Sequence, residues 1–248
     1  MNILEVNNLS FTYDGHAGDK SNEVLHNLTF SIAENQCVGL IGANGAGKST
    51  LLKLVCGLLD MQHGNINVAG IKLQKDNLKA IRKKVGYVFQ DSDSQLFMST
   101  VYEDVAFAPR NYRMNNEQVD ESVMQALRMV HLEELKYRHI YSLSGGEKKL
   151  ASIATVLATQ SKLMLMDEPS VALDPRNRRN LIHIVNELPM AKLIASHDLD
   201  FIYDTCQEVI LLKKGEIVGI DATEKILRNR PLLEANGLEL PLSLSRNL

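Results

Sequence analysis

The sequence contains few cysteines, no long apolar run and no excess of positive charge. Its 3 cysteines, Cys37, Cys56 and Cys206, are widely spaced and odd in number, which favours buried free thiols in a reducing cytoplasm. No apolar stretch approaches the roughly 18 residues that a membrane-spanning helix needs. Lys and Arg number 27 against 30 Asp and Glu, so no basic field favours nucleic acid as a partner. Residues 1–5 lack the segments of a signal peptide, so we expect none.

Short apolar runs alternate with helix-like segments along much of the chain. Four runs end at glycine or polar residues and predict buried strands of a parallel sheet. They lie at residues 37–41, 85–89, 163–166 and 192–195. Helical spacing occurs at residues 47–56 and 144–159, and Pro175 with Asp174 as candidate N-cap predicts another helix start. The alternation predicts an α/β fold whose sheet carries helices on both faces.

Hairpins and a helical insert account for most of the remaining sequence. Four further strand patterns occur at residues 3–8, 24–32, 208–212 and 217–220. The first two are separated by a polar, glycine-bearing loop at residues 13–22. No strong strand pattern occurs from about 92 to 143, where we expect helices with a break at Pro109. Residues 231–248 are apolar but contain two prolines, and we expect an irregular extension there.

Residues 42–49 fit the phosphate-binding pattern G-x-x-x-x-G-K-[ST]. Glycines let the backbone curl so that successive N–H groups face a phosphate, Lys48 adds a positive charge, and Ser49 offers a hydroxyl to Mg²⁺. A glycine-rich turn with a solvated lysine is the alternative. The position after a buried strand and before a helix is the context that the motif requires. The nucleotide-binding residues expected here are Gly42, Asn44, Gly45, Ala46, Gly47, Lys48, Ser49 and Thr50.

The apolar run at residues 163–166 is followed by two carboxylates, Asp167 and Glu168. A parallel strand delivers its carboxyl end to the ligand crevice. We expect Asp167 to reach Mg²⁺, through water, and Glu168 to polarise the attacking water as general base. A charged strand end without such a role is the alternative.

Three further polar or aromatic residues are candidates for the same site. Gln90 ends a predicted strand and can bind both Mg²⁺ and the attacking water. His197 follows another strand and can hydrogen-bond a γ-phosphate, although a lone histidine is more often structural. Tyr13 can stack on adenine. An exposed strand end and an exposed loop tyrosine are the alternatives for Gln90 and Tyr13.

A second anion-binding pattern lies at residues 143–147, Leu-Ser-Gly-Gly-Glu. Ser144, Gly145 and Gly146 open a predicted helix, so a hydroxyl and free backbone N–H groups lie together at its positive end. Two anion loops and one carboxylate pair in one chain suggest a site that is closed between two chains.

Taken in order along the chain, these motifs resemble those of the ABC-type ATPases. The motifs are the phosphate loop at 42–49, Gln90, residues 143–147, Asp167 with Glu168, residues 172–174 and His197. The resemblance covers essentially the whole chain. It implies a P-loop fold with a RecA-like core, an N-terminal antiparallel β subdomain and a helical signature subdomain. Residues 1–230 would form one domain, with the helical subdomain at about 92–158, and residues 231–248 a C-terminal extension.

The resemblance also implies the chemistry and the assembly. ATP and Mg²⁺ would be the cofactors, and Lys48, Gln90, Glu168 and His197 the catalytic residues. Ser49, Gln90 and Asp167 would hold the metal. The serine-glycine-glycine loop would bind the γ-phosphate of ATP held by a second subunit, a copy or a paralogue, in a head-to-tail dimer. Asp174 would lie in a loop that touches the partner's site.

A narrower resemblance, carried by residues 90–107 and 232–241, is to the ATPases of energy-coupling factor (ECF) transporters of the cobalt and nickel type. It implies a groove near Gln90 to Tyr102 for helices of a transmembrane coupling subunit, a substrate-binding membrane component, and a peripheral place at the cytoplasmic face of a bacterial or archaeal membrane. Phe97, Met98, Val101 and Tyr102 would be its anchors, with burial inside the helical insert as the alternative.

Three other functions are compatible with the sequence. The chain could serve vitamin uptake, act as a soluble non-transport ABC ATPase, or be a nucleotide-gated scaffold without catalysis. The sequence departs from the family pattern at Leu150, where arginine is usual, and at Ser142, Ser170 and Ser196. The change at Leu150 puts one contact of the signature helix in doubt.

Overall fold

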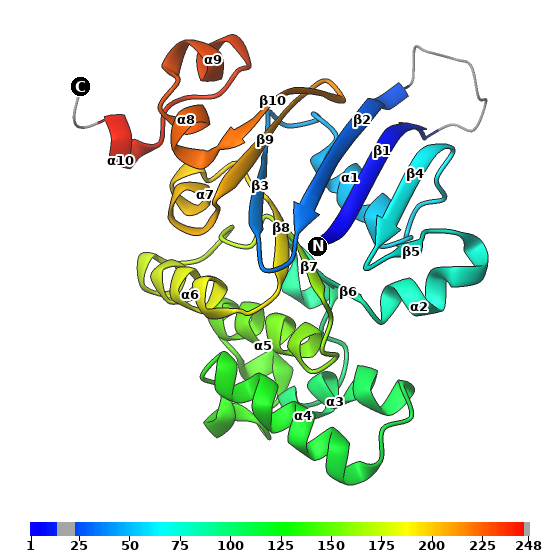
Figure 1. Ribbon diagram of the computed structural model, residues 1–248. Helices are drawn as coiled ribbons and strands as arrows, with labels where there is room; N and C mark the ends of the chain where they lie inside the picture. The colour runs from blue at the N-terminus through cyan, green and yellow to red at the C-terminus, as the bar shows by residue number, and fades with distance from the viewer. Residues whose placement is uncertain (14–22, 246–248) are drawn as a thin grey trace.

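The computed structural model describes residues 1–13 and 23–245, and its centre is a six-stranded sheet of order β10-β9-β3-β8-β7-β6 (Figure 1). The strands are β3 (Cys37–Ile41), β6 (Val85–Val88), β7 (Leu163–Asp167), β8 (Ala191–Ala195), β9 (Glu208–Lys213) and β10 (Glu216–Ala222). All pairs are parallel except β10 with β9. Lys214 and Gly215 between them both have positive φ, as in a tight hairpin turn. The expected parallel sheet is confirmed, with one antiparallel edge.

A second, antiparallel sheet has the order β2-β1-β4-β5. Its strands are β1 (Asn2–Thr12), β2 (Glu23–Ala33), β4 (His63–Val68) and β5 (Ile71–Lys72). The hairpin expected from residues 3–8 and 24–32 is confirmed. Residues 14–22 of its expected loop are not among the residues that the structure describes. β4 carries only two buried side chains, Ile66 and Val68, among Asn, Gly and His, so its sequence shows no strand pattern.

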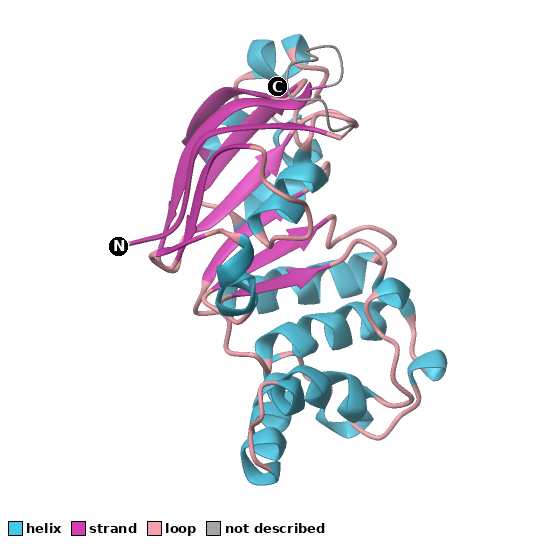
Figure 2. Ribbon diagram, turned by 90° about the vertical axis from the view of Figure 1, so that its right-hand side faces the viewer, coloured by secondary structure: helices cyan, strands magenta, loops and turns pink. Residues whose placement is uncertain are grey.

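Helices fill the space between the sheets and cover the far face of the central sheet. They are α1 (Lys48–Val55), α2 (Leu78–Arg82), α3 (Val101–Asn111), α4 (Asn116–Met129), α5 (Gly145–Leu157), α6 (Pro175–Glu187), α7 (Leu199–Thr205), α8 (Thr223–Leu227), α9 (Arg230–Ala235) and α10 (Leu242–Ser245). Figures 1 and 2 show α3, α4 and α5 gathered at one end of the molecule. Across residues 1–13 and 23–245, none of the helices has the length and apolar character needed to cross a membrane.

The inner parallel strands of the central sheet, β3, β7 and β8, are buried on both faces, which explains their uninterrupted apolar runs. Along β7, Leu163 and Leu165 pack into the core that contains α1, whereas Met164 and Met166 pack into the core that contains α5 and α6. Alternate side chains of one strand thus belong to opposite cores.

Two local expectations were wrong in detail. α3 continues through Pro109 and ends at Asn111, because a proline in the last turn of a helix removes only one hydrogen bond before the chain turns away. The segment expected to be an irregular extension contains α9 and α10. Pro231 lies in the first turn of α9, where its missing N–H costs nothing.

Candidate active site

Four neighbouring parallel strands end in polar residues at one edge of the central sheet. β3 leads into the glycine-rich loop, β6 into Gln90, β7 into Glu168 and β8 into His197. A cleft of about 470 Å³ opens at this edge, where α/β sheets bind ligands. It is lined by Tyr13, Val24, Asn44, Gly45, Ala46, Gly47, Lys48, Ser49, Thr50, Gln90, Glu168 and His197. The structure therefore brings together residues from motifs spread along the whole chain; Val24 was not among the candidates.

The glycine-rich loop requires glycine at two positions for steric reasons. Gly42 has φ +155°, and a Cβ there would lie 2.2 Å from the carbonyl oxygen of Leu212. Gly47 has φ +105°, and a Cβ would lie 2.5 Å from the side chain of Leu25. α1 begins directly after Gly47, and no side chain caps its first N–H groups. These N–H groups and the helix dipole are available to an anion in the cleft.

The Lys48 ammonium lies across this loop. Its Nζ donates to the carbonyl oxygens of Gly42 at 2.7 Å and Ala43 at 3.4 Å. Burial lowers the pKa of Lys48, and the carboxylates of Glu168 and Asp167 oppose that shift. A phosphate oxygen would give this desolvated cation a stronger, charge-assisted partner than the two carbonyls.

The oxygen atoms expected to hold a metal ion lie next to Lys48. Ser49 Oγ donates to Asp167 Oδ1 at 3.0 Å, and Tyr87 Oη donates to Asp167 Oδ2 at 3.1 Å. Gln90 lines the same cleft. A hydroxyl, a carboxylate and an amide oxygen are ligands that Mg²⁺ accepts, usually with several waters. The residues present therefore fit Mg²⁺, and Tyr87 is a neighbour that the sequence did not suggest.

The Glu168 carboxylate is tied to the end of β8 through one oxygen. Oε2 accepts hydrogen bonds from Ser196 Oγ at 3.0 Å and from the His197 N–H at 3.1 Å, and lies 2.8 Å from His197 Nδ1. Glu168 has φ +46°, an uncommon conformation for a residue with a side chain. Its N–H donates to the carbonyl of Ala195 at 2.8 Å. Glu168 and His197 are thus in direct contact at the cleft, and Ser196, one of the departures from the family pattern, helps to hold them.

Tyr13 lies at the outer end of the cleft. Its hydroxyl is 3.1 Å from Thr50 Oγ1, and 51% of the residue is exposed. Phe11 packs edge-on against its ring, with centroids 5.1 Å apart. The ring is therefore supported on one side and accessible to a nucleobase.

Ser144, Gly145 and Gly146 form the start of α5 and are not among the residues that line this cleft. Ser144 Oγ accepts from the Glu147 N–H, and Glu147 Oε2 accepts from the Ser144 N–H at 2.7 Å, which is a capping box. Ser144 and Gly145 are exposed. A Cβ at Gly146 would lie 2.5 Å from the side chain of Asn177 in α6. The serine-glycine loop is thus well ordered by local contacts and open to another molecule.

Leu150, where the family usually has arginine, is an apolar residue of the core, and a buried cation lies next to it in the chain. Leu150 is buried in the core, whereas Lys149, 3% exposed, donates from Nζ to the carbonyls of Phe89 at 3.0 Å and Gln90 at 2.8 Å. Burial lowers the pKa of Lys149 to about 8. A cation one position earlier in α5 therefore holds the strand end that carries Gln90.

A groove of about 330 Å³ lies beside the cleft, between β6, α3 and α5. Phe97 and Phe107 form one wall, with ring centroids 4.8 Å apart, and are 63% and 39% exposed. Phe97 is the one of the four expected anchors that lines the groove. Val101 is fully buried in the core, so its expected role as an anchor is wrong: helical spacing does not say which apolar face is covered.

The other two expected anchors, Met98 and Tyr102, are half-buried. Tyr102 packs near Tyr137 with ring centroids 6.1 Å apart and donates its hydroxyl to Asp120. Its side chain is therefore engaged within the helical part of the chain.

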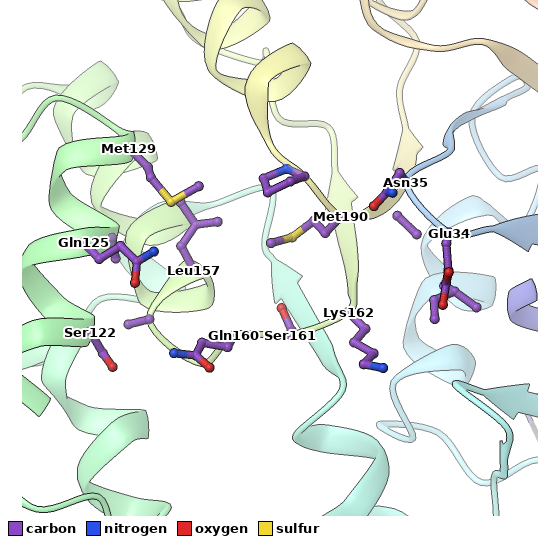
Figure 3. Close-up of a pocket in the computed structure, with 15 residues that line it drawn as sticks. Glu34, Asn35, Ser122, Gln125, Met129, Leu157, Gln160, Ser161, Lys162 and Met190 are labelled. Atoms are coloured by element: carbon purple, nitrogen blue, oxygen red, sulfur yellow. The ribbon is translucent and has the colours of Figure 1, made fainter. Parts of the chain in front are cut away.

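Figure 3 shows a separate cavity of about 330 Å³, where α4 and the end of α5 face the amino ends of β7 and β8. Gln125 and Gln160 face Asn35 and Met190 across it. Ser161 Oγ is buried there and has no hydrogen-bond partner among the described residues. The cavity contains none of the motif residues and is distinct from the nucleotide cleft.

Comparison with known proteins assigns the family. The sequence model of the ABC transporter family matches residues 25–171. An energy-coupling factor transporter ATP-binding protein, EcfA, of Carboxydothermus hydrogenoformans is 40% identical over 247 residues, covering 98% of this chain and 89% of the relative. The chain belongs to the ABC transporter ATPases, a family that binds and hydrolyses ATP.

Solved structures agree with this assignment. The chain is similar to cbiO1 from Clostridium perfringens, part of the ABC transporter complex cbiONQ, with TM-score 0.84, 28% identity and coverage of 99% of this chain and 98% of that one. It is also similar to the dimeric ABC transporter cassette MJ0796, with TM-score 0.76, 26% identity and coverage of 89% and 98%. The expected fold class, a P-loop core with an antiparallel β part and a helical part, is confirmed.

Proposed function

We propose that this chain is the ATP-hydrolysing subunit of an ECF-type importer, with cobalt or nickel ions as cargo. The observation that carries the proposal is that an aromatic groove lies beside a complete nucleotide cleft. The two meet at the end of β6, where Phe89 lines the groove and Gln90 lines the cleft. Similarity to EcfA and to cbiO1 supports the same class of transporter.

Catalysis follows from the positions of side chains in the cleft. The N–H groups of the loop and Lys48 bind and orient the phosphates of ATP. Ser49, Gln90 and Asp167 would hold Mg²⁺, which would supply positive charge to the phosphates. Glu168 polarises a water toward the γ-phosphate, and His197, exposed over 59% of its side chain, contacts that phosphate. Ser196 keeps the Glu168 carboxylate oriented.

The active assembly is a head-to-tail dimer with a second ATPase subunit. The exposed start of α5 offers a hydroxyl and free N–H groups to the γ-phosphate bound by the other subunit. Asp174 lies close by, because Asn177 touches Gly146 and donates to Asp174 Oδ2 at 2.6 Å. Both elements that would face the partner are thus packed against each other. The dimeric state of a similar cassette supports this arrangement.

The groove receives a coupling helix of the transmembrane subunit. Asp104 at its floor has one oxygen that accepts from the N–H groups of Phe97 and Met98, both at 3.1 Å. Its Oδ2 is buried and unpaired within the part of the chain that the structure describes. Burial raises the pKa of Asp104, and the two N–H donors oppose this. Asp104 is thus occupied in holding the backbone of Phe97, and the fitting occupant is an amphipathic helix with an apolar anchor for the exposed Phe97 ring.

Cargo would enter through a substrate-binding membrane component, so this chain does not contact it. The chain would lie at the cytoplasmic face of the membrane as a peripheral subunit. Vitamin uptake through the same class of importer is the second candidate, and a soluble ABC ATPase without a membrane partner is the third.

Purification of the tagged chain from its native membranes in a mild detergent tests the proposal. We expect a transmembrane subunit and a substrate-binding component to be recovered with it. Phe97→Asp should abolish their recovery. Val218→Asp should not, because Val218 is a 42% exposed residue of β10, at the opposite edge of the central sheet from β6. Uptake of cobalt and nickel by cells, compared with uptake of vitamins, then identifies the cargo. Recovery of no membrane protein would refute the importer proposal.

A further inference from the structure

We propose that Tyr87 is a positioning residue for the metal-binding carboxylate of Asp167, and that its ring carries the state of the groove to the nucleotide cleft. The positioning of Asp167 by Tyr87 concerns this chain alone. The link from the groove to the cleft rests on the proposed function for the identity of the molecule that occupies the groove.

Asp167 is nearly inaccessible, with 6% of the residue exposed. Each of its oxygens accepts one hydroxyl: Oδ1 from Ser49 and Oδ2 from Tyr87. Ser49 directly follows Lys48 of the phosphate loop, and its hydroxyl would itself be a ligand of the metal. Tyr87 comes from β6 and has no such task. Its hydrogen bond therefore holds the carboxylate torsion in place whether or not the loop is loaded, and partners of this kind orient metal-binding groups.

The position of Tyr87 in β6 makes this contact possible. Tyr87 pairs in register with Leu165 in β7, two residues before Asp167. A tyrosine at this point can reach along the neighbouring strand to its carboxyl end. A phenylalanine would fill the same space, so packing alone does not require the hydroxyl of Tyr87. A hydroxyl that is withdrawn from water needs a hydrogen-bond partner, and here Asp167 is that partner.

The same ring forms part of the groove. Tyr87 and Phe89 have ring centroids 4.6 Å apart, and both line the groove with Phe97 and Phe107. The backbone of Phe89 is fixed on both sides: its N–H donates to Gln95 at 3.0 Å and its carbonyl accepts from Lys149. A molecule in the groove that displaces the Phe89 ring therefore shifts the Tyr87 ring and not the backbone. The shift reaches Asp167 through the hydroxyl of Tyr87.

The test measures metal binding directly and does not depend on turnover. Tyr87→Phe keeps the ring and removes only the hydroxyl. Binding of a non-hydrolysable ATP analogue is followed by calorimetry over a series of Mg²⁺ concentrations, and Mn²⁺ binding by electron paramagnetic resonance. We expect the half-saturating metal concentration to rise about tenfold, while affinity for the analogue without metal is unchanged. An unchanged metal concentration would overturn the proposal, even if the melting temperature falls.

The link to the groove is tested by two matched changes in its wall. Phe89→Leu loses the ring contact with Tyr87, and we expect the half-saturating metal concentration to rise about threefold. Phe107→Leu alters the same groove at the ring that packs on Phe97, and we expect no change. Equal shifts in both variants, or none in Phe89→Leu, would refute the link. All measurements use the isolated chain, so failure to recover a membrane subunit would refute the importer proposal and leave this one standing.

Discussion

Glutamine in place of Glu168 removes the basic oxygen and little else. The amide oxygen can still accept from Ser196 Oγ and the His197 N–H, which lie 3.0 and 3.1 Å from Oε2. Because these contacts become neutral rather than charge-assisted, we expect a loss of about 1 kcal/mol in folding stability. Proton acceptance from water is lost altogether. General-base catalysis contributes about 10²- to 10⁴-fold, so we expect kcat to fall by about 1,000-fold, or about 4 kcal/mol in barrier height.

Phosphate release under saturating ATP measures this fall, and thermal unfolding measures the stability. ATP binding does not need the base, so the Glu168→Gln variant should bind ATP and accumulate as a dimer in size-exclusion chromatography. Glu187→Gln, an exposed change in α6, serves as the control with normal turnover. Turnover of Glu168→Gln within about threefold of the natural chain would show that Glu168 is not the base.

Three other changes test separate parts of the structure. Ser144→Arg places a long cation at the start of α5; ATP binding by the monomer should persist and ATP-driven dimerisation, followed by light scattering, should disappear, and a variant that still dimerises would contradict the shared site. Lys48→Ala removes the ammonium from the cleft and should weaken ATP binding in calorimetry by at least about tenfold; unchanged affinity would place the phosphates elsewhere. Asp198→Asn breaks a half-buried pair with Arg178, whose nitrogens lie 2.7 and 2.9 Å from the carboxylate, and should cost about 2 kcal/mol in urea unfolding. Burial raises the pKa of Asp198, but hydrogen bonds from Arg178 and the Phe201 N–H outweigh it and the net shift is downward. The contribution of Asp198 is therefore complete above about pH 4 and is lost as pH falls further; a variant with the same acid sensitivity as the natural chain would refute this reasoning.

Local chemistry made much of this molecule predictable. The phosphate loop needs its glycines, the strand before it must be buried, and the helix after it must begin at Lys48, so sequence and structure agree there. The helix start at Pro175 is confirmed in the same way, since Asp174 accepts from the N–H groups of Arg176 and Asn177. These features depend on residues only a few positions apart.

The contacts that complete the site could not be predicted, because they depend on which strands are neighbours. Ser196 and Glu168 lie 28 positions apart, and Tyr87 and Asp167 lie 80 apart. Each pair meets only once β6, β7 and β8 are placed side by side. Val101 could not be placed from the sequence for the same reason. Which apolar side chains of α3 are buried depends on how that helix packs against the rest of the chain.

The capping box at the start of α5 makes the Ser144 oxygen serve two purposes. The oxygen accepts from the Glu147 N–H, while its own proton is left to be donated outward. The group that would recognise a phosphate is also the group that keeps its helix from fraying. An alanine scan would therefore misreport this position, because truncation melts the first turn at the same time as it removes the donor. Aspartate, which accepts from the Glu147 N–H but has no proton to donate, is the substitution that separates recognition from helix integrity.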